Sequence, residues 1–207
     1  MKQVWRRAAL GVAATMVTTL GLAGSASAGV LVESPAECPE QSLAQVFAPW
    51  GDRSWYTQVP NGGLEHGANG WSLTGSARVV AGNEPWKVSG PGASSVRIPS
   101  GSSALSPPLC VGVEHPTIRF FAKKNSGLLS TLSVSAQIKT SLGLTVELPF
   151  GVLVGGSQWK PSPAYLYLGN LVTLLPGQYT EMRFRFTPLL GGDWQVDEVY
   201  VDPYRAK

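Results

Sequence analysis

The chain has 207 residues, 43% of them hydrophobic, and its 16 basic and 13 acidic residues give a formal net charge of +3. Three of the basic residues, Lys2, Arg6 and Arg7, lie among the first 28, so the rest of the chain carries 13 charges of each sign. This neutral balance argues against the basic surface typical of nucleic-acid binding or of binding to anionic membranes. The length fits one domain that buries roughly 70% of its unfolded surface.

The first 28 residues have the pattern of a cleavable signal peptide. A basic start is followed by an apolar stretch from Ala8 to Leu22, and Ala26-Ser27-Ala28 supplies the small residues that signal peptidase requires. We therefore predict cleavage before Gly29 and a secreted, extracellular protein with no membrane span after cleavage. The alternative is an uncleaved anchor, but the apolar stretch is shorter than the roughly 20 residues that cross a bilayer.

Cys38 and Cys110 are the two cysteines of the chain. Both follow the predicted signal peptide and would meet an oxidising compartment, which predicts one disulfide between them. The alternative is a catalytic or metal-binding thiol.

Turn residues divide the chain after the signal peptide into two regions. Residues 29–58 carry several prolines without clear periodicity and are predicted to form an irregular N-terminal arm, with a possible helical turn at 42–46. Residues 59–207 are predicted to form an all-β domain, a two-sheet antiparallel jelly-roll sandwich. The expected strands are 71–73, 77–81, 94–98, 117–122, 131–139, 144–148, 164–168, 181–187 and 194–201.

Alternation of apolar and polar residues assigns faces to several of these strands. The inward side chains are expected to be Leu132, Val134, Ala136, Ile138, Met182, Phe184 and Phe186. In strand 164–168 we expect Leu166 and Leu168 to point inward and Tyr165 and Tyr167 to point outward. Trp71 and Trp194 are expected in the core. The last strand changes phase across Asp197-Glu198, which predicts a β-bulge at that point.

Two segments resemble a known group of proteins. Pro60-Asn61-Gly62-Gly63-Leu64-Glu65 followed by Gly70-Trp71, and the closing stretch from Trp194 to Val201, resemble the opening and closing strands of jelly-roll carbohydrate-binding modules of the galactose-binding-domain-like superfamily. Leu64 replaces the usual aromatic residue, and Glu198 replaces a second Asp. Residues 47–52 and 81–85 look more like a set of secreted actinobacterial proteins, and that likeness implies no activity.

The resemblance also implies a structural calcium ion. In such modules an acidic residue of the opening motif and one of the closing strand commonly hold it, and the matching residues are Glu65 and Asp197. Calcium takes six to eight oxygen ligands, which a bulge beside a loop can supply. The alternative is that Asp197 and Glu198 are solvated strand-end charges, or that they pair with Arg183 or Arg185. No other cofactor is expected.

Carbohydrate binding needs flat aromatic faces that stack on sugar rings, and polar side chains that bond to hydroxyl groups. The candidates on one outer sheet face are Tyr165, Tyr167, Gln137, Arg183 and Arg185, and two loop tryptophans, Trp86 and Trp159, form a second set. These residues predict a secreted, non-catalytic module for polysaccharide or cell-envelope glycan. The alternative is a structural or protein-interaction domain at the cell surface.

An enzyme is the weakest of the three functional hypotheses. His66 and His115 are the two histidines, neither has metal-site spacing, and no G-x-S-x-G turn occurs. A glycoside hydrolase would need two carboxylates about 5 to 9.5 Å apart. The candidates for such a pair are Glu65, Asp193, Asp197, Glu198 and Asp202.

Overall fold

A computed structural model describes residues 32–167 and 179–203. The predicted signal peptide, residues 1–28, lies outside the described residues. Within the described part of the chain no helix is long and apolar enough to cross a membrane. The elements are a 3-10 turn, η1 (Ala48–Trp50), and the strands β1 (Thr57–Gln58), β2 (Ser72–Thr74), β3 (Arg78–Ala81), β4 (Ser94–Pro99), β5 (Ser103–Leu105), β6 (Leu109–Val111), β7 (Thr117–Ser126), β8 (Thr131–Lys139), β9 (Thr145–Leu153), β10 (Lys160–Pro161), β11 (Tyr165–Leu166), β12 (Thr180–Leu189) and β13 (Asp193–Asp202).

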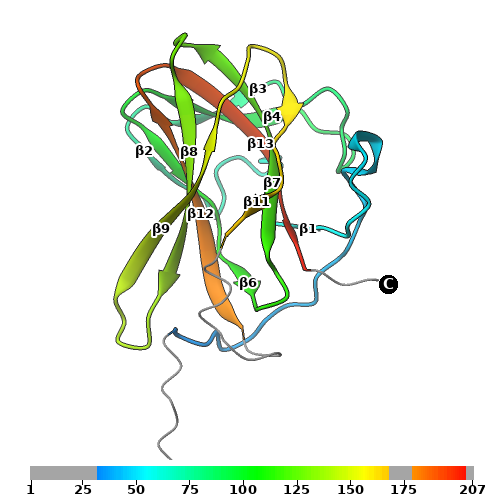
Figure 1. Cartoon of the computed structure of the whole chain (residues 1–207), viewed down its shortest axis with the longest axis vertical. Coiled ribbons are helices and arrows are strands. Elements are labelled where there is room, and N and C mark those ends of the chain that lie inside the picture. The colour runs from blue at the N-terminus through cyan, green and yellow to red at the C-terminus, as the bar shows by residue number, and fades with distance from the viewer. Residues whose placement is uncertain (1–31, 168–178, 204–207) are drawn as a thin grey trace, which may run out of the picture.

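The strands form two antiparallel sheets that pack face to face, which confirms the jelly-roll sandwich (Figure 1). The seven-stranded sheet has the order β10-β7-β13-β4-β3, with β1 paired to β13 and β11 paired to β7. The six-stranded sheet has the order β2-β5-β12-β8-β9, with β6 paired to β12. The first and last strands therefore meet in the larger sheet, where β1 pairs with β13.

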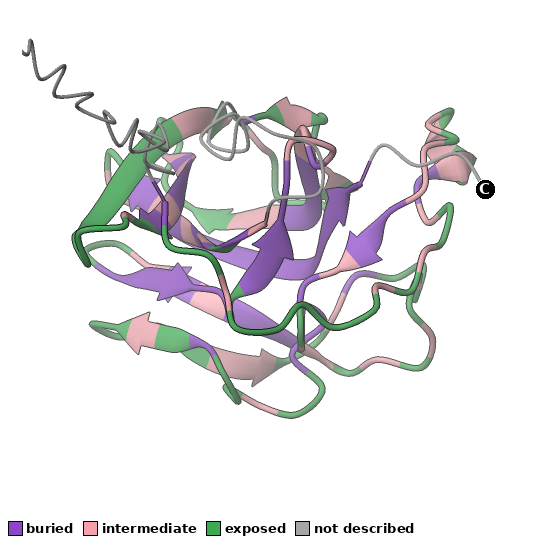
Figure 2. Ribbon diagram, turned by 90° about the horizontal axis from the view of Figure 1, so that it is seen from below, coloured by how far each residue is buried: buried purple, intermediate pink, exposed green. Residues whose placement is uncertain are grey.

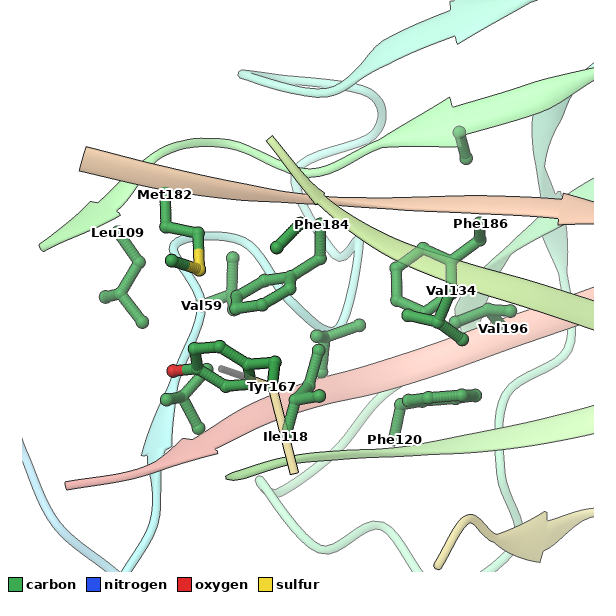
Figure 3. Packing of buried hydrophobic residues seen from close by; sticks show 14 of the residues in the cluster. Val59, Leu109, Ile118, Phe120, Val134, Tyr167, Met182, Phe184, Phe186 and Val196 are labelled. Atoms are coloured by element: carbon green, nitrogen blue, oxygen red, sulfur yellow. The ribbon is translucent and has the colours of Figure 1, made fainter. Parts of the chain in front are cut away.

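The main core fills the space between the sheets. All seven inward side chains predicted on β8 and β12 are buried there, and Trp71 and Trp194 join them, as predicted. Figure 3 shows Phe184 and Phe186 from β12 facing Ile118 and Phe120 from β7. Burial follows the central strands, whereas the loops are exposed (Figure 2). Burying a large aromatic or aliphatic side chain contributes roughly 1.5 to 3 kcal/mol, so each of these residues stabilises the sandwich.

The predicted bulge in the last strand is confirmed. The pairing of β13 with β7 shifts register between Asp197 and Tyr200, so two residues of β13 lie opposite Phe120 alone. Trp194, Val196, Val199 and Val201 are consequently all buried in the core. Asp197 and Tyr200 lie on the other face, opposite Phe121 and Arg119.

Several short elements escaped the sequence prediction. β1, β5, β6 and β10 have two or three residues each, too few for alternation to be visible. The prediction of a helical turn at 42–46 is wrong. The turn forms instead at Ala48–Trp50, where the ring of Pro49 restricts the backbone.

The predicted faces of strand 164–168 are also wrong. Tyr165 pairs with the inward Ile118 and packs against the core, and the exposed residue is Leu166, at 57%. Tyr167 follows the end of β11 and is fully buried between Phe150 and Phe184, as Figure 3 shows for Phe184. Alternation failed here because β11 has only two residues. Leu168 lies outside the described residues.

The described part of the N-terminal arm covers the outer face of the larger sheet. Phe47 and Tyr56 pack on Phe121 and Tyr200, which makes a second aromatic cluster outside the sandwich. The Arg119 guanidinium lies 4.2 Å from the centroid of the Phe47 ring.

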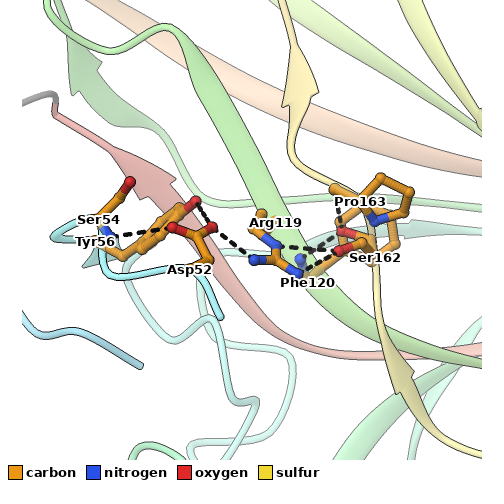
Figure 4. A network of polar contacts seen from close by, with 7 residues as sticks. All are labelled: Asp52, Ser54, Tyr56, Arg119, Phe120, Ser162 and Pro163. Atoms are coloured by element: carbon orange, nitrogen blue, oxygen red, sulfur yellow. Dashed lines mark hydrogen bonds and ion pairs between the residues drawn. The ribbon is translucent and has the colours of Figure 1, made fainter. Parts of the chain in front are cut away.

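Polar contacts fix the arm in this position. Asp52 accepts hydrogen bonds from Tyr56 Oη at 2.7 Å and from Arg119 Nη1 at 2.6 Å, and Arg119 also donates to the carbonyl of Ser162 (Figure 4). The predicted disulfide between Cys38 and Cys110 is present and ties the arm to β6. Closing this long loop stabilises the fold by about 4 kcal/mol in the chain-entropy model.

Tyr167 provides a test of the core. Its hydroxyl is buried and has no hydrogen-bond partner in the described chain, and a buried unsatisfied group costs about 1 to 3 kcal/mol. Tyr167→Phe is expected to raise the free energy of unfolding by about 1 kcal/mol in urea titrations. Tyr56→Phe, which loses its bond to Asp52, should lower it by a similar amount. A loss of stability in Tyr167→Phe would show that the hydroxyl is satisfied.

Candidate functional site

Three tryptophans gather on the outer face of the seven-stranded sheet. Trp50, Trp86 and Trp159 all pack against the cluster that contains Phe121, and we call them the tryptophan surface. The Trp50 and Trp86 rings meet edge to face, with centroids 5.0 Å apart, and both lie within 5.5 Å of the Phe121 ring centroid. Trp86 remains 46% exposed. An indole face supported in this way can stack on the apolar face of a sugar ring.

Trp50 reaches this face from the N-terminal arm. It is the last residue of η1, and Gly51 ends the turn with a left-handed φ of 84° and an N–H bond to the carbonyl of Ala48. A residue with a β-carbon would be strained at this φ. The turn therefore ends directly after Trp50, whose ring packs on Phe121 and Trp86.

The loop between β3 and β4 positions Trp86. Glu84 is buried, and its carboxylate accepts the backbone N–H groups of Trp86 at 2.5 Å and Val88 at 2.8 Å. Lys87 takes a positive φ of 52° between these two bonds. The Glu84 carboxylate therefore acts as an internal anchor for the loop that carries the exposed indole.

Two acidic residues at the bulge of β13 form hydrogen bonds with this loop. Asp197 accepts the N–H of Glu84 and the N–H of Glu198, each at 2.9 Å. Glu198 bonds to Ser89 at the end of the loop and accepts from Gln58 Nε2 at 2.6 Å. Asp197 is fully buried and Glu198 nearly so, which is unusual for acidic side chains and places both outside direct contact with a ligand.

Burial changes the acidity of this cluster. It raises the pKa of Asp197 to about 8, and the neighbouring Glu198 and Glu84 add to the increase, whereas the two backbone N–H bonds oppose it. Burial also raises the pKa of Glu198, against the hydrogen bonds from Ser89, Tyr200 and Gln58. Around neutral pH, Asp197 therefore favours its protonated form.

The polar residues predicted as a ligand set do come together, without the tyrosines. Gln137 lies opposite Arg183 across β8 and β12, on the outer face of the six-stranded sheet, and Arg185 lies two residues further along. Arg183 donates to the carbonyl of Ser106 and Arg185 pairs with Glu147 at 3.0 Å. The guanidinium groups on this face are thus bonded within the domain.

The carboxylates of Glu65 and Asp197, for which the resemblance implies calcium, are both bonded to main-chain N–H groups. The Glu65 carboxylate accepts two backbone N–H groups, from Ala93 and Ser94, and both oxygens of Asp197 accept backbone N–H groups. In the described ranges, no group of three or more Asp, Glu, His or Cys side chains is arranged to hold a metal ion. Calcium binding by this pair remains a prediction.

Sequence reasoning found Trp86 and Trp159 but not Trp50. Pro49-Trp50 and Pro85-Trp86 are the same dipeptide, each in a turn, so the repeat was a usable signal. Nothing in the sequence indicated that the two turns would meet over Phe121, because this contact joins segments about 35 and 70 residues apart along the chain.

No family model matches this chain, and no curated protein matches it. Among solved structures, the CBM22-1 and GH10 modules of an endo-1,4-β-D-xylanase from Clostridium thermocellum, complexed with xylohexaose, align over 70% of this chain with a TM-score of 0.51 and 16% identity. This chain spans 28% of that one. A xylan-binding domain of family 22 aligns over 75% of this chain and 99% of its own, with 17% identity and a TM-score of 0.48. The first likeness shows a shared fold.

The acidic cluster predicts a pH dependence of stability. A raised pKa means that the folded state holds a proton that the unfolded state releases, so the free energy of unfolding should fall as pH rises from about 4 to about 8. Glu198→Gln keeps hydrogen-bonding groups toward Ser89 and Gln58 and removes one charge beside Asp197. Urea titrations between pH 5 and 9 should show a smaller fall in this variant. Equal slopes in the two proteins would contradict the role of the cluster.

Proposed function

We propose that this protein is a secreted, non-catalytic module that binds polysaccharide through the tryptophan surface. The observation that carries the proposal is the exposed Trp86 indole, held against Trp50 on a floor formed by Phe121. Rigid, partly exposed aromatic rings bind flat apolar faces at a low cost in conformational entropy. The jelly-roll fold is in keeping with this role, although a fold by itself does not fix function.

We propose a non-catalytic module because of where the acidic side chains lie. Asp197 and Glu198 are buried beneath the Trp86 loop, and Asp193 pairs with Arg97 at 2.6 Å. These carboxylates are therefore poorly placed to flank a glycosidic bond in an open cleft. Secretion is supported by the predicted signal peptide and by the disulfide, which persists in oxidising compartments.

A second function, interaction with another protein, has an observation in its favour. The turns between β7 and β8 and between β12 and β13 are neighbours at one end of the sandwich (Figure 1). Two pairs of exposed leucines lie at these turns, Leu128-Leu129 and Leu189-Leu190. The turns contact each other, since Ser130 Oγ donates to the carbonyl of Leu189 at 3.1 Å. Exposed apolar patches of this kind often mark interaction sites.

The first prediction of the proposal concerns the indole. Trp86→Ala should weaken binding to a recognised insoluble polysaccharide about ten-fold, because the stacking surface is lost, and Trp86→Phe should retain much of the affinity. The assay is depletion by a panel of polysaccharides, followed by isothermal titration with a soluble oligosaccharide.

Gln137→Ala provides the matched control on the other sheet and should bind normally. Loss of binding in Gln137→Ala alone would move the site to the six-stranded sheet. A folded wild-type protein that binds no polysaccharide would overturn the proposal in favour of the protein-interaction role.

The calcium prediction is tested with the same protein. If Glu65 and Asp197 hold a structural ion, EDTA should lower the melting temperature and added calcium should restore it, with the effect lost in Glu65→Gln. An unchanged melting temperature would exclude a structural calcium ion.

A further inference from the structure

The tryptophan surface carries lysines at its edge. Lys123 lies on β7 two residues after Phe121, so both side chains point to the outer face of the sheet. The Lys123 ammonium lies 5.2 Å from the centroid of the Trp159 ring, a cation–π distance. Lys87 is exposed and follows Trp86 directly. Trp159 therefore has an ammonium group over its ring, and Trp86 has an exposed lysine next to it in the chain.

These charges are not neutralised within the described residues. The ion pairs there join Arg97 to Asp193, Arg119 to Asp52 and Arg185 to Glu147, so neither Lys123 nor Lys87 takes part in one. The acidic side chains beneath the Trp86 loop, Glu84, Asp197 and Glu198, are at most 2% exposed. Glu65 is exposed and accepts the N–H of Ala93, seven residues after Trp86 at the end of the same loop. Lys123, beside the Trp159 ring, and Lys87, next to Trp86 in the chain, therefore contribute positive charge to the tryptophan surface.

Trp86 and Trp159 differ in how much of the indole ring is open to a ligand. Lys123 covers part of Trp159, which leaves Trp86 as the exposed stacking face and makes Trp159 a support for the ammonium group. Phe121, beneath Trp86, and Lys123 are separated by two residues of one strand, about 7 Å. A sugar ring stacked on Trp86 would therefore lie on the same sheet face as Lys123.

We infer that the tryptophan surface selects carboxylated polysaccharides, those that contain uronic acid, over neutral ones. This inference rests on the proposed function and names its ligand class. An ammonium group bonds to a carboxylate through short charge-assisted hydrogen bonds, while the indole stacks on the same sugar. A neutral polysaccharide keeps the stacking and loses the charge interaction.

The experiment compares two ligands that differ in the carboxylate alone. Polygalacturonic acid and its carboxyl-reduced form are titrated by affinity electrophoresis against the full mature protein at low and high salt. The wild type should bind the acidic polymer at least about three-fold more tightly at low salt, with the preference falling as salt rises. Lys123→Gln should lose about three-fold in affinity for the acidic polymer and none for the neutral one.

Lys160→Gln is the matched control. Lys160 is exposed and lies opposite Ala122, whose side chain faces the core, so its side chain starts from the other face of the sheet from Trp159. The same charge change there should leave both affinities unaltered. If Lys123→Gln and Lys160→Gln lost equal affinity for the acidic polymer, the preference would come from the net charge of the protein and not from this surface. That result would overturn the inference.

The outcomes for the wild type separate the two proposals. Equal affinity for both polymers, lost together in Trp86→Ala, would overturn the carboxylate preference and leave the proposed function standing. Binding of neither polymer, nor of any polysaccharide in the panel, would overturn the proposed function and the ligand class with it.

Discussion

The bulge in β13 is the constraint on which the fold and the candidate site both depend. Inserting one residue between Asp197 and Tyr200 returns Val199 and Val201 to the core after Trp194 and Val196. The same irregularity places two carboxylates on the outer face, where they hold the loop of Trp86 through main-chain and side-chain bonds. In a regular strand without the bulge, either Val199 and Val201 would leave the core or the carboxylates would no longer bond to the Trp86 loop.

The outer faces of the two sheets differ in what covers them. On the six-stranded sheet, Arg183 bonds to the carbonyl of Ser106 and Arg185 pairs with Glu147. On the seven-stranded sheet, the N-terminal arm brings a second hydrophobic cluster and one side of the tryptophan surface, fixed by the bond between Arg119 and Asp52. The arm therefore contributes to the candidate binding face rather than only to stability.

Sequence patterns predicted the sandwich where strands are long enough for periodicity. β8 and β12 each have nine or more residues, and all of their predicted inward side chains are buried. In the two-residue β11 the same reasoning reversed the faces, so Tyr165 and Tyr167 were expected on the surface and lie against or within the core. Short strands take their orientation from the neighbour they pair with, which is here β7.

The sequence by itself determined the fold class, the core faces of the long strands, the bulge and the disulfide partners, because each follows from local periodicity, a local phase change or simple pairing. Only the tertiary structure decided which polar and aromatic residues share a face. Trp50, Trp86 and Phe121 come from an arm, a loop and a strand, and meet because the arm folds over the larger sheet. Contacts between distant segments depend on packing of the whole chain, which no local pattern records.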